Sequence, residues 1–162
     1  MQLGESFVGE GVNAAHINTV VGPRDGPVGT AWATALASPS LGHAPFVVVM
    51  RPGLPVKPYT LFVNKARIDT DEHGEMTWGP AQAGVAAGVA RALQDGVVEQ
   101  SHAVISAVWV NPRANHVNDV FAFNREATYR ALVAGARDEP TVSDVLAEID
   151  DVWNPFFRPR AQ

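Results

Sequence analysis

The chain has 162 residues, of which 46% are hydrophobic and 18% are charged, and its formal net charge is −5. This length suits one domain with its own core, and the composition is too apolar for a disordered chain. The acidic balance argues against a nucleic-acid surface, which requires clustered Lys and Arg. Cysteine is absent from the sequence, which excludes disulfides and thiolate chemistry.

The sequence has no apolar run of the roughly 20 residues needed to cross a bilayer. Its first residues also lack the basic and then apolar pattern of a signal peptide. We therefore expect a cytoplasmic protein with neither membrane nor nucleic acid as a partner. We expect a single domain over residues 1–162, in which residues 151–162 form a C-terminal tail that is apolar and then basic.

Five segments have the length and composition of β-strands: 3–8, 14–21, 46–50, 59–68 and 103–110. The second alternates, so that one face carries Ala15, Ile17, Thr19 and Val21 and the other carries His16, Asn18 and Val20. The third is continuously apolar, which predicts a central strand covered on both faces. Three prolines follow it within residues 51–58 and cannot pair in the interior of a sheet.

Four helices are predicted between and after these strands. The first covers residues 27–37 with Asp25 as its cap, and the second covers 80–94 with Pro80 at the first helical position. Many Ala and Gly residues in the second would let another element pack very close to it. Asn124 is predicted to cap a helix to residue 136, and a last helix follows Pro140, bearing Val142, Leu146, Ile149 and Trp153. This mixture predicts an α/β or α+β protein with helices packed on a sheet.

The polar clusters of the sequence carry little specific chemistry. Residues 69–76 gather Asp, Glu and His in what reads as a solvated turn, and their spacing matches no calcium loop, so no metal site is expected. No Ser or Thr occupies a nucleophile elbow. His16 and Asn18 share one strand face, with alternate residues roughly 6–7 Å apart. They either hold a small polar molecule together, or His16 is buried with a satisfied hydrogen bond.

Four segments resemble the formaldehyde-activating enzymes in order and spacing: VGEGVNAAHINTVVG, GPVGTAWATAL, GHAPFVVVMRPGLPVKPYTLFVNK and WGPAQAGVAAGVARAL. The resemblance covers roughly residues 3–137. It implies a fold like the second domain of ribosomal protein S5 and a ring of five subunits. It also implies condensation of formaldehyde with the co-substrate tetrahydromethanopterin, in a cleft between adjacent subunits, to give the methylene derivative and water, without a covalently bound cofactor.

The resemblance also implies roles for six residues. His16 matches the family's proton donor, which protonates the oxygen that leaves as water. Lys65, one of only two lysines in the chain, and Gln82 match binding residues. Gln82 is predicted in the first turn of a helix, where free N–H groups favour carbonyl or anionic ligand groups. Three further binding positions depart from the family: Asn18 replaces Asp, Val47 replaces Leu, and Arg67 replaces Thr.

Two of these departures predict a weaker proton donor. A carboxylate beside His16 would favour the imidazolium, whereas the amide of Asn18 cannot do so through charge. Arg67, predicted on the same strand face as Lys65, would repel a protonated His16. We therefore expect weak or absent activity with tetrahydromethanopterin. Asn18→Asp and Arg67→Thr should raise it, more in the double variant than in either single one. Two alternatives stay open: an enzyme for a different amine or a more anionic cofactor, and a non-catalytic ring that binds an aldehyde or a pterin-like metabolite.

Overall fold

The computed structural model describes residues 1–158, so the part of the predicted tail at 159–162 lies outside the described residues. Its centre is a mixed five-stranded sheet in which only the β7–β6 pair is parallel. In spatial order the strands are β1 (Gln2–Val8), β2 (Ala15–Pro23), β7 (His102–Trp109), β6 (Tyr59–Asn64) and β3 (Phe46–Val47). A separate hairpin contains β4 (Val49–Arg51) and β5 (Leu54–Pro55).

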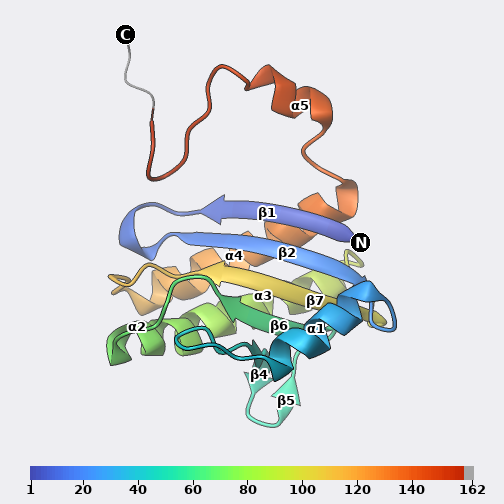
Figure 1. The fold of residues 1–162 in the computed structure, drawn as a ribbon, viewed down its shortest axis with the longest axis vertical. Helices are drawn as coiled ribbons and strands as arrows, with labels where there is room; N and C mark the ends of the chain where they lie inside the picture. The colour runs from blue at the N-terminus through green and yellow to red at the C-terminus, as the bar shows by residue number, and fades with distance from the viewer. Residues whose placement is uncertain (159–162) are drawn as a thin grey trace.

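The helices lie mainly on one side of this sheet. Figure 1 shows α3 and α4 behind the strands and α1 in front of them. The helices are α1 (Pro27–Ala37), α2 (Asp71–Met76), α3 (Gln82–Gln94), α4 (Val117–Arg137) and α5 (Val142–Ala147), with a short 3₁₀ turn at Gly11–Asn13 and a π turn at Thr77–Ala81. The predicted mixed class, with helices packed on a sheet, is confirmed. The more specific likeness to ribosomal protein S5 stays a prediction.

The predicted alternation along β2 is confirmed. Ala15, Ile17 and Val21 are buried in the core beneath the helices, while Asn18 is exposed on the opposite face. His16 lies on the same face as Asn18 and is only half-buried. The alternative in which His16 is buried is therefore wrong, and part of its side chain is open to solvent.

The apolar run at 46–50 is not a central strand. It is divided between β3, at the edge of the main sheet, and β4, in the hairpin. Val48 is nevertheless completely buried, because the run is covered by α3 as well as by strand neighbours. The backbone N–H of Val49 donates to the Gln82 side-chain oxygen at 2.6 Å. A side chain of α3 therefore takes the hydrogen bond that a neighbouring strand would otherwise accept.

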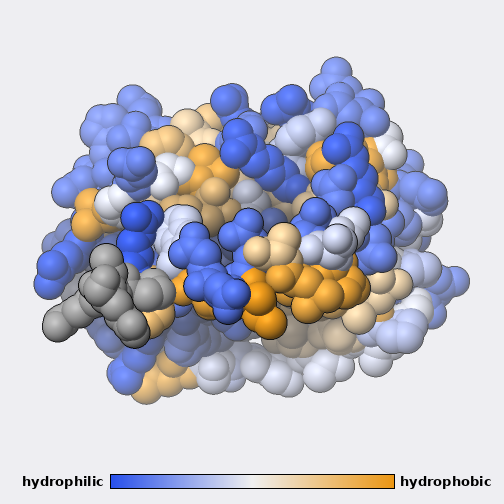
Figure 2. All heavy atoms as spheres, turned by 90° about the horizontal axis from the view of Figure 1, so that it is seen from above, coloured by the Kyte–Doolittle hydropathy of each residue, from blue (hydrophilic) through white to orange (hydrophobic). Residues whose placement is uncertain are grey.

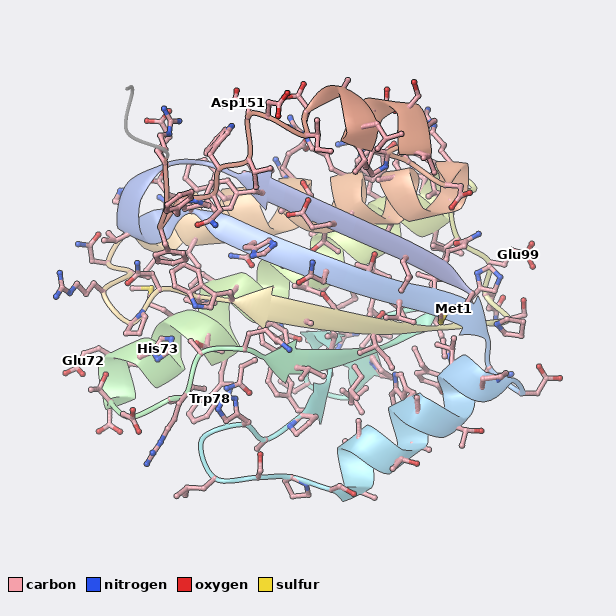
Figure 3. The ribbon with its side chains drawn as sticks, turned by 45° about the horizontal axis from the view of Figure 1, so that its top comes forward. Met1, Glu72, His73, Trp78, Glu99 and Asp151 are labelled. Atoms are coloured by element: carbon pink, nitrogen blue, oxygen red, sulfur yellow. The ribbon has the colours of Figure 1, made fainter. Side chains whose placement is uncertain are left out.

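The polar turn predicted at 69–76 is the helix α2. Thr70 caps it by accepting a hydrogen bond from the His73 N–H at 3.2 Å, and two acidic residues follow in the first turn. These are ordinary helix-start signals. His73 points from α2 towards the interior and Glu72 points away (Figure 3), and the His73 Nε2 pairs with the Val110 carbonyl oxygen at 3.0 Å.

The helix predicted at residues 80–94 is α3, and its regular α-helical part starts two residues later than predicted. Pro80 lies within the π turn that joins α2 to α3, and Gln82, not Pro80, begins the regular α-helix. Similarly, Asn124 is not a cap. It lies inside α4, and the cap of that helix is His116, which accepts from the Asp119 N–H. The first helix has its predicted bounds, but its cap is Gly26 and not Asp25.

Glycines let α3 and α4 approach closely, as the small residues of α3 predict. A Cβ at Gly88 would lie 2.6 Å from the Arg125 carbonyl oxygen, and one at Gly84 would lie 2.6 Å from that of Phe121. On its other side α4 meets β1, where a Cβ at Gly4 would clash with the Ala131 carbonyl oxygen. Helix α4 is therefore held between α3 and β1 at backbone contact distance.

The C-terminal segment 138–158, called the arm below, lies apart from these layers above β1 (Figure 1). Helix α5 ends at Ala147, so the predicted stripe does not continue through Ile149 and Trp153 on one helix. Figure 2, which looks down on the arm, shows apolar side chains gathered there. The exposed apolar residues of the arm are Val142, Val145, Leu146, Ile149, Val152, Trp153, Phe156 and Phe157.

None of the helices within residues 1–158 is long and apolar enough to cross a membrane. In the same described range, no three His, Asp or Glu side chains come together as metal ligands would.

The close α3–α4 contact predicts that a methyl group added at Gly88 changes the stability of the protein. Gly88→Ala gains about 1 kcal/mol of helix propensity, but overpacking against backbone costs typically about 1–3 kcal/mol. We expect a net loss of stability, measured as the free energy of unfolding in urea. The control is Gly79→Ala, where an added Cβ has nothing within 4 Å. An equal change in both variants would contradict the close contact.

Candidate active site

A pocket opens at one end of the exposed sheet face and brings three of the predicted residues together. His16 and Asn18 reach it from β2, and Lys65 reaches it from the residue just after β6. Its volume is about 600 Å³, within the range of small-molecule sites. The lining residues are Phe7, Gly11, Ala14, His16, Asn18, Lys65, Trp109, Asn111, Asn154, Pro155 and Phe156.

His16 is held in the sheet between two aromatic residues. Its Cα pairs with that of Phe7 on β1 and with that of Trp109 on β7. The Phe7 and His16 rings are tilted, with centroids 6.2 Å apart. The neighbours Ala15 and Ile17 are completely buried on the other face, which fixes the backbone that carries the imidazole.

The imidazole has an acidic partner that lies two positions before Phe7. The Glu5 Oε1 is 2.9 Å from the His16 Nε2, and Glu5 lies directly across from Asn18 in the β1–β2 pairing. The side chains of Glu5 and His16 are 59% and 41% exposed, so both are open to solvent. Of the two, only His16 lines the pocket. The amide of Asn18 therefore does not leave His16 without a nearby carboxylate.

Lys65 is positioned by its backbone and by the residue before it. Its N–H donates to the Val108 carbonyl oxygen at 2.8 Å. The buried Asn64 amide donates to the carbonyl oxygens of Gly42 and Ala66, which ties down the chain on both sides. Lys57, the other lysine, does not line the pocket. Its ammonium lies 3.1 Å from the ring centroid of Tyr59.

The remaining walls are aromatic and amide groups. The Trp109 and Phe156 rings meet edge to face with centroids 5.6 Å apart, so the arm closes one side of the pocket. Three amide side chains, those of Asn18, Asn111 and Asn154, can both donate and accept hydrogen bonds. Aromatic walls with scattered amides and one ammonium suit a flat, polar heterocycle.

Val47 and Gln82 lie in a different pocket of the chain. It has a volume of about 520 Å³ and is lined by Ala44, Pro45, Phe46, Val47, Val49, Trp78 and Gln82. The Gln82 side-chain oxygen is occupied by the Val49 N–H, so its NH₂ group is what remains for a ligand. Within one chain, the six predicted site residues are therefore not brought to one place.

Arg67 lines neither of these two pockets. Strand β6 ends at Asn64, so Arg67 does not share a strand face with Lys65, contrary to the prediction. Its Nε is 2.7 Å from the Asp69 Oδ1, and its aliphatic stem packs beside Gly42. The expected repulsion between Arg67 and His16 lacks a geometric basis within the chain, since the guanidinium is paired and outside the His16 pocket.

Comparison with known proteins identifies the family of the chain. Residues 3–157 match the family described as "Formaldehyde-activating enzyme (Fae)". The chain belongs to this family. It is 38% identical to the 5,6,7,8-tetrahydromethanopterin hydro-lyase of Methanosarcina barkeri, over 95% of the chain and 89% of that protein.

Longer members of the formaldehyde-activating enzyme family are also similar to the chain. The bifunctional enzyme Fae/Hps of Archaeoglobus fulgidus is 36% identical over 96% of the chain, and that of Methanosphaera stadtmanae is 36% identical over the same share. The chain spans only 40% and 39% of their respective lengths.

The prediction of a formaldehyde-activating enzyme family member is thus confirmed, while reasoning from the sequence missed Glu5. The signal was present in the strand pattern. If residues 3–8 and 14–21 pair through the turn at Gly9–Gly11, a register that sets Phe7 opposite His16 also sets Glu5 opposite Asn18. The aromatic partners Trp109 and Phe156 were missed as well, because they come from segments distant in sequence.

Proposed function

We propose that this protein condenses formaldehyde with tetrahydromethanopterin, giving the methylene derivative and water. The carrying observation is that His16, Asn18 and Lys65 line one pocket in a chain of this family. The similar protein of M. barkeri is named as a hydro-lyase of tetrahydromethanopterin. The aromatic walls and amides of the pocket fit a pterin ring, which is planar and rich in hydrogen-bonding groups.

When bound, the pterin supplies the amine nitrogens that take up the formaldehyde carbon, and the oxygen leaves as water with two amine hydrogens. His16 acts as the general acid that gives a proton to this oxygen while its bond to carbon breaks. A proton released by an amine then restores His16, so no net proton is consumed. Lys65 and Asn18 orient the polar edge of the pterin, and Phe7 and Trp109 bound the space around it.

The division of the predicted binding residues supports an oligomeric site. Val47 and Gln82 lie in one pocket and His16, Asn18 and Lys65 in another. A single ligand would meet both sets only if two subunits bring them together. We therefore propose a homopentameric ring with composite sites. The small-residue face of α3 does not support this assembly, since α4 of the same chain covers it.

Assembly is tested by the mass in solution. Multi-angle light scattering should give about five times the 17.3 kDa of one chain, because a composite site needs a neighbouring subunit. A monomer at micromolar concentration would rule out both the ring and the shared site.

The role of His16 is tested by its removal. His16→Ala should lower the catalysed rate of condensation by about 100- to 10,000-fold, the usual contribution of general acid catalysis. The measurement is formation of the methylene pterin, with the spontaneous reaction subtracted. His102→Ala serves as a control on the same sheet, because His102 lies at the other end of β7. A rate unchanged by His16→Ala would remove His16 from the mechanism.

The unmodified protein should be active, in contrast to the expectation from the sequence. Glu5 supplies a carboxylate to His16, and Arg67 is paired with Asp69. Asn18→Asp and Arg67→Thr should therefore each change kcat/KM by less than about tenfold, or about 1.4 kcal/mol in the barrier. Their effects should add, because the two residues share no partner. A large gain confined to the double variant would restore the idea of an eroded site.

The alternative cofactor with a more anionic group has less support, since the guanidinium of Arg67 already has an acidic partner. If the unmodified protein, the two single variants Asn18→Asp and Arg67→Thr, and the double variant are all inactive with the pterin, the non-catalytic ring is favoured.

A further inference from the structure

We propose that Glu5 is a positioning residue for His16. Its carboxylate accepts a hydrogen bond from the His16 Nε2 and so directs the other ring nitrogen, Nδ1, to the oxygen that leaves. This inference rests on the proposed function and extends it to a residue of β1 outside the six site positions discussed above.

The contact is a close ion pair whose N···O distance suits a charge-assisted hydrogen bond. The His16 Nε2 and the Glu5 Oε1 are 2.9 Å apart. An ionised carboxylate can only accept hydrogen bonds, so Nε2 must carry a hydrogen to make this one. The proton that His16 exchanges with the substrate oxygen is then the proton on Nδ1. After transfer, Nδ1 recovers a proton from an amine of the pterin, and Nε2 keeps its hydrogen throughout.

The backbones of both residues are fixed from the opposite face of the sheet. Glu5 is flanked by Gly4 and Ser6, which are buried against the helices, and Gly4 contacts the backbone of Ala131. His16 is flanked by the buried Ala15 and Ile17. Two side chains on adjacent paired strands therefore meet diagonally without needing any mobile segment to bring them together.

The charged residues near His16 have different placements. Lys65 lines the same pocket, as a cation, and Glu5 supplies the carboxylate that lies 2.9 Å from the His16 Nε2. Glu10 is an exposed acid in the turn after β1, and it does not line this pocket. Glu10 is therefore a matched control that carries the same charge at a neighbouring place.

The kinetic test compares Glu5→Ala, Glu5→Gln and Glu10→Gln in the full chain. Glu5→Ala should lower kcat at least about tenfold, a part of the roughly 100- to 10,000-fold that a general acid contributes. Its KM should stay within about twofold, since a positioning residue acts on the chemical step. Glu5→Gln keeps an oxygen that can accept the hydrogen bond, so it should lose less than Glu5→Ala. Glu10→Gln should match the unmodified protein.

An NMR measurement makes the result independent of activity. The ¹⁵N resonances of the His16 ring, recorded where the ring is neutral, should shift at Nε2 in Glu5→Ala and should not shift in Glu10→Gln. If the unmodified protein does not accelerate condensation, the proposed function fails, and the NMR comparison alone decides the role of Glu5.

Three results would overturn the role of Glu5. The first is an unchanged Nε2 resonance in Glu5→Ala. The second is an unchanged kcat in that variant of an active enzyme. The third is an equal loss of kcat in Glu10→Gln, which would assign the effect to overall charge.

Discussion

Close backbone packing of α4 between α3 and β1 is the constraint on which the rest of the structure depends. Gly84 and Gly88 of α3 let the α4 backbone approach on one side, and Gly4 of β1 does the same on the other. At these three positions no side chain separates the backbones. Because β1 is an edge strand, this helix contact fixes its position as much as its pairing with β2 does. Phe7 and Glu5 therefore approach His16 from β1, a strand whose opposite face packs against α4.

Local pattern predicted most of the fold, and the errors have identifiable causes. The alternation in β2 and the buried run in β7 reflect one covered sheet face, which the period of the side chains reports directly. The apolar run at 46–50 was wrongly predicted to be a central strand. A helix can bury a segment at the sheet edge as fully as flanking strands can. Pro80 was wrongly predicted to be the first residue of a helix. It lies inside the π turn Thr77–Ala81, which accommodates a residue without a backbone N–H.

The site was predicted less completely than the fold. The motif resemblance selected His16 and Lys65, and both line one pocket, but a motif describes positions and not the partners that pairing brings to them. Glu5 lies on a different strand, and the pairing register decides that it meets His16. Arg67 shows the reverse case: two residues of separation suggested a shared face with Lys65, but the strand had already ended at Asn64.

The arm that supplies Asn154, Pro155 and Phe156 to the pocket has a thermodynamic consequence. A ligand that touches both this segment and the sheet favours the docked arrangement of the arm. Reciprocally, docking of the arm must raise the affinity for that ligand by the same factor. Changes at the exposed apolar surface of α5, which does not line the His16 pocket, can then alter binding through the docking of the arm.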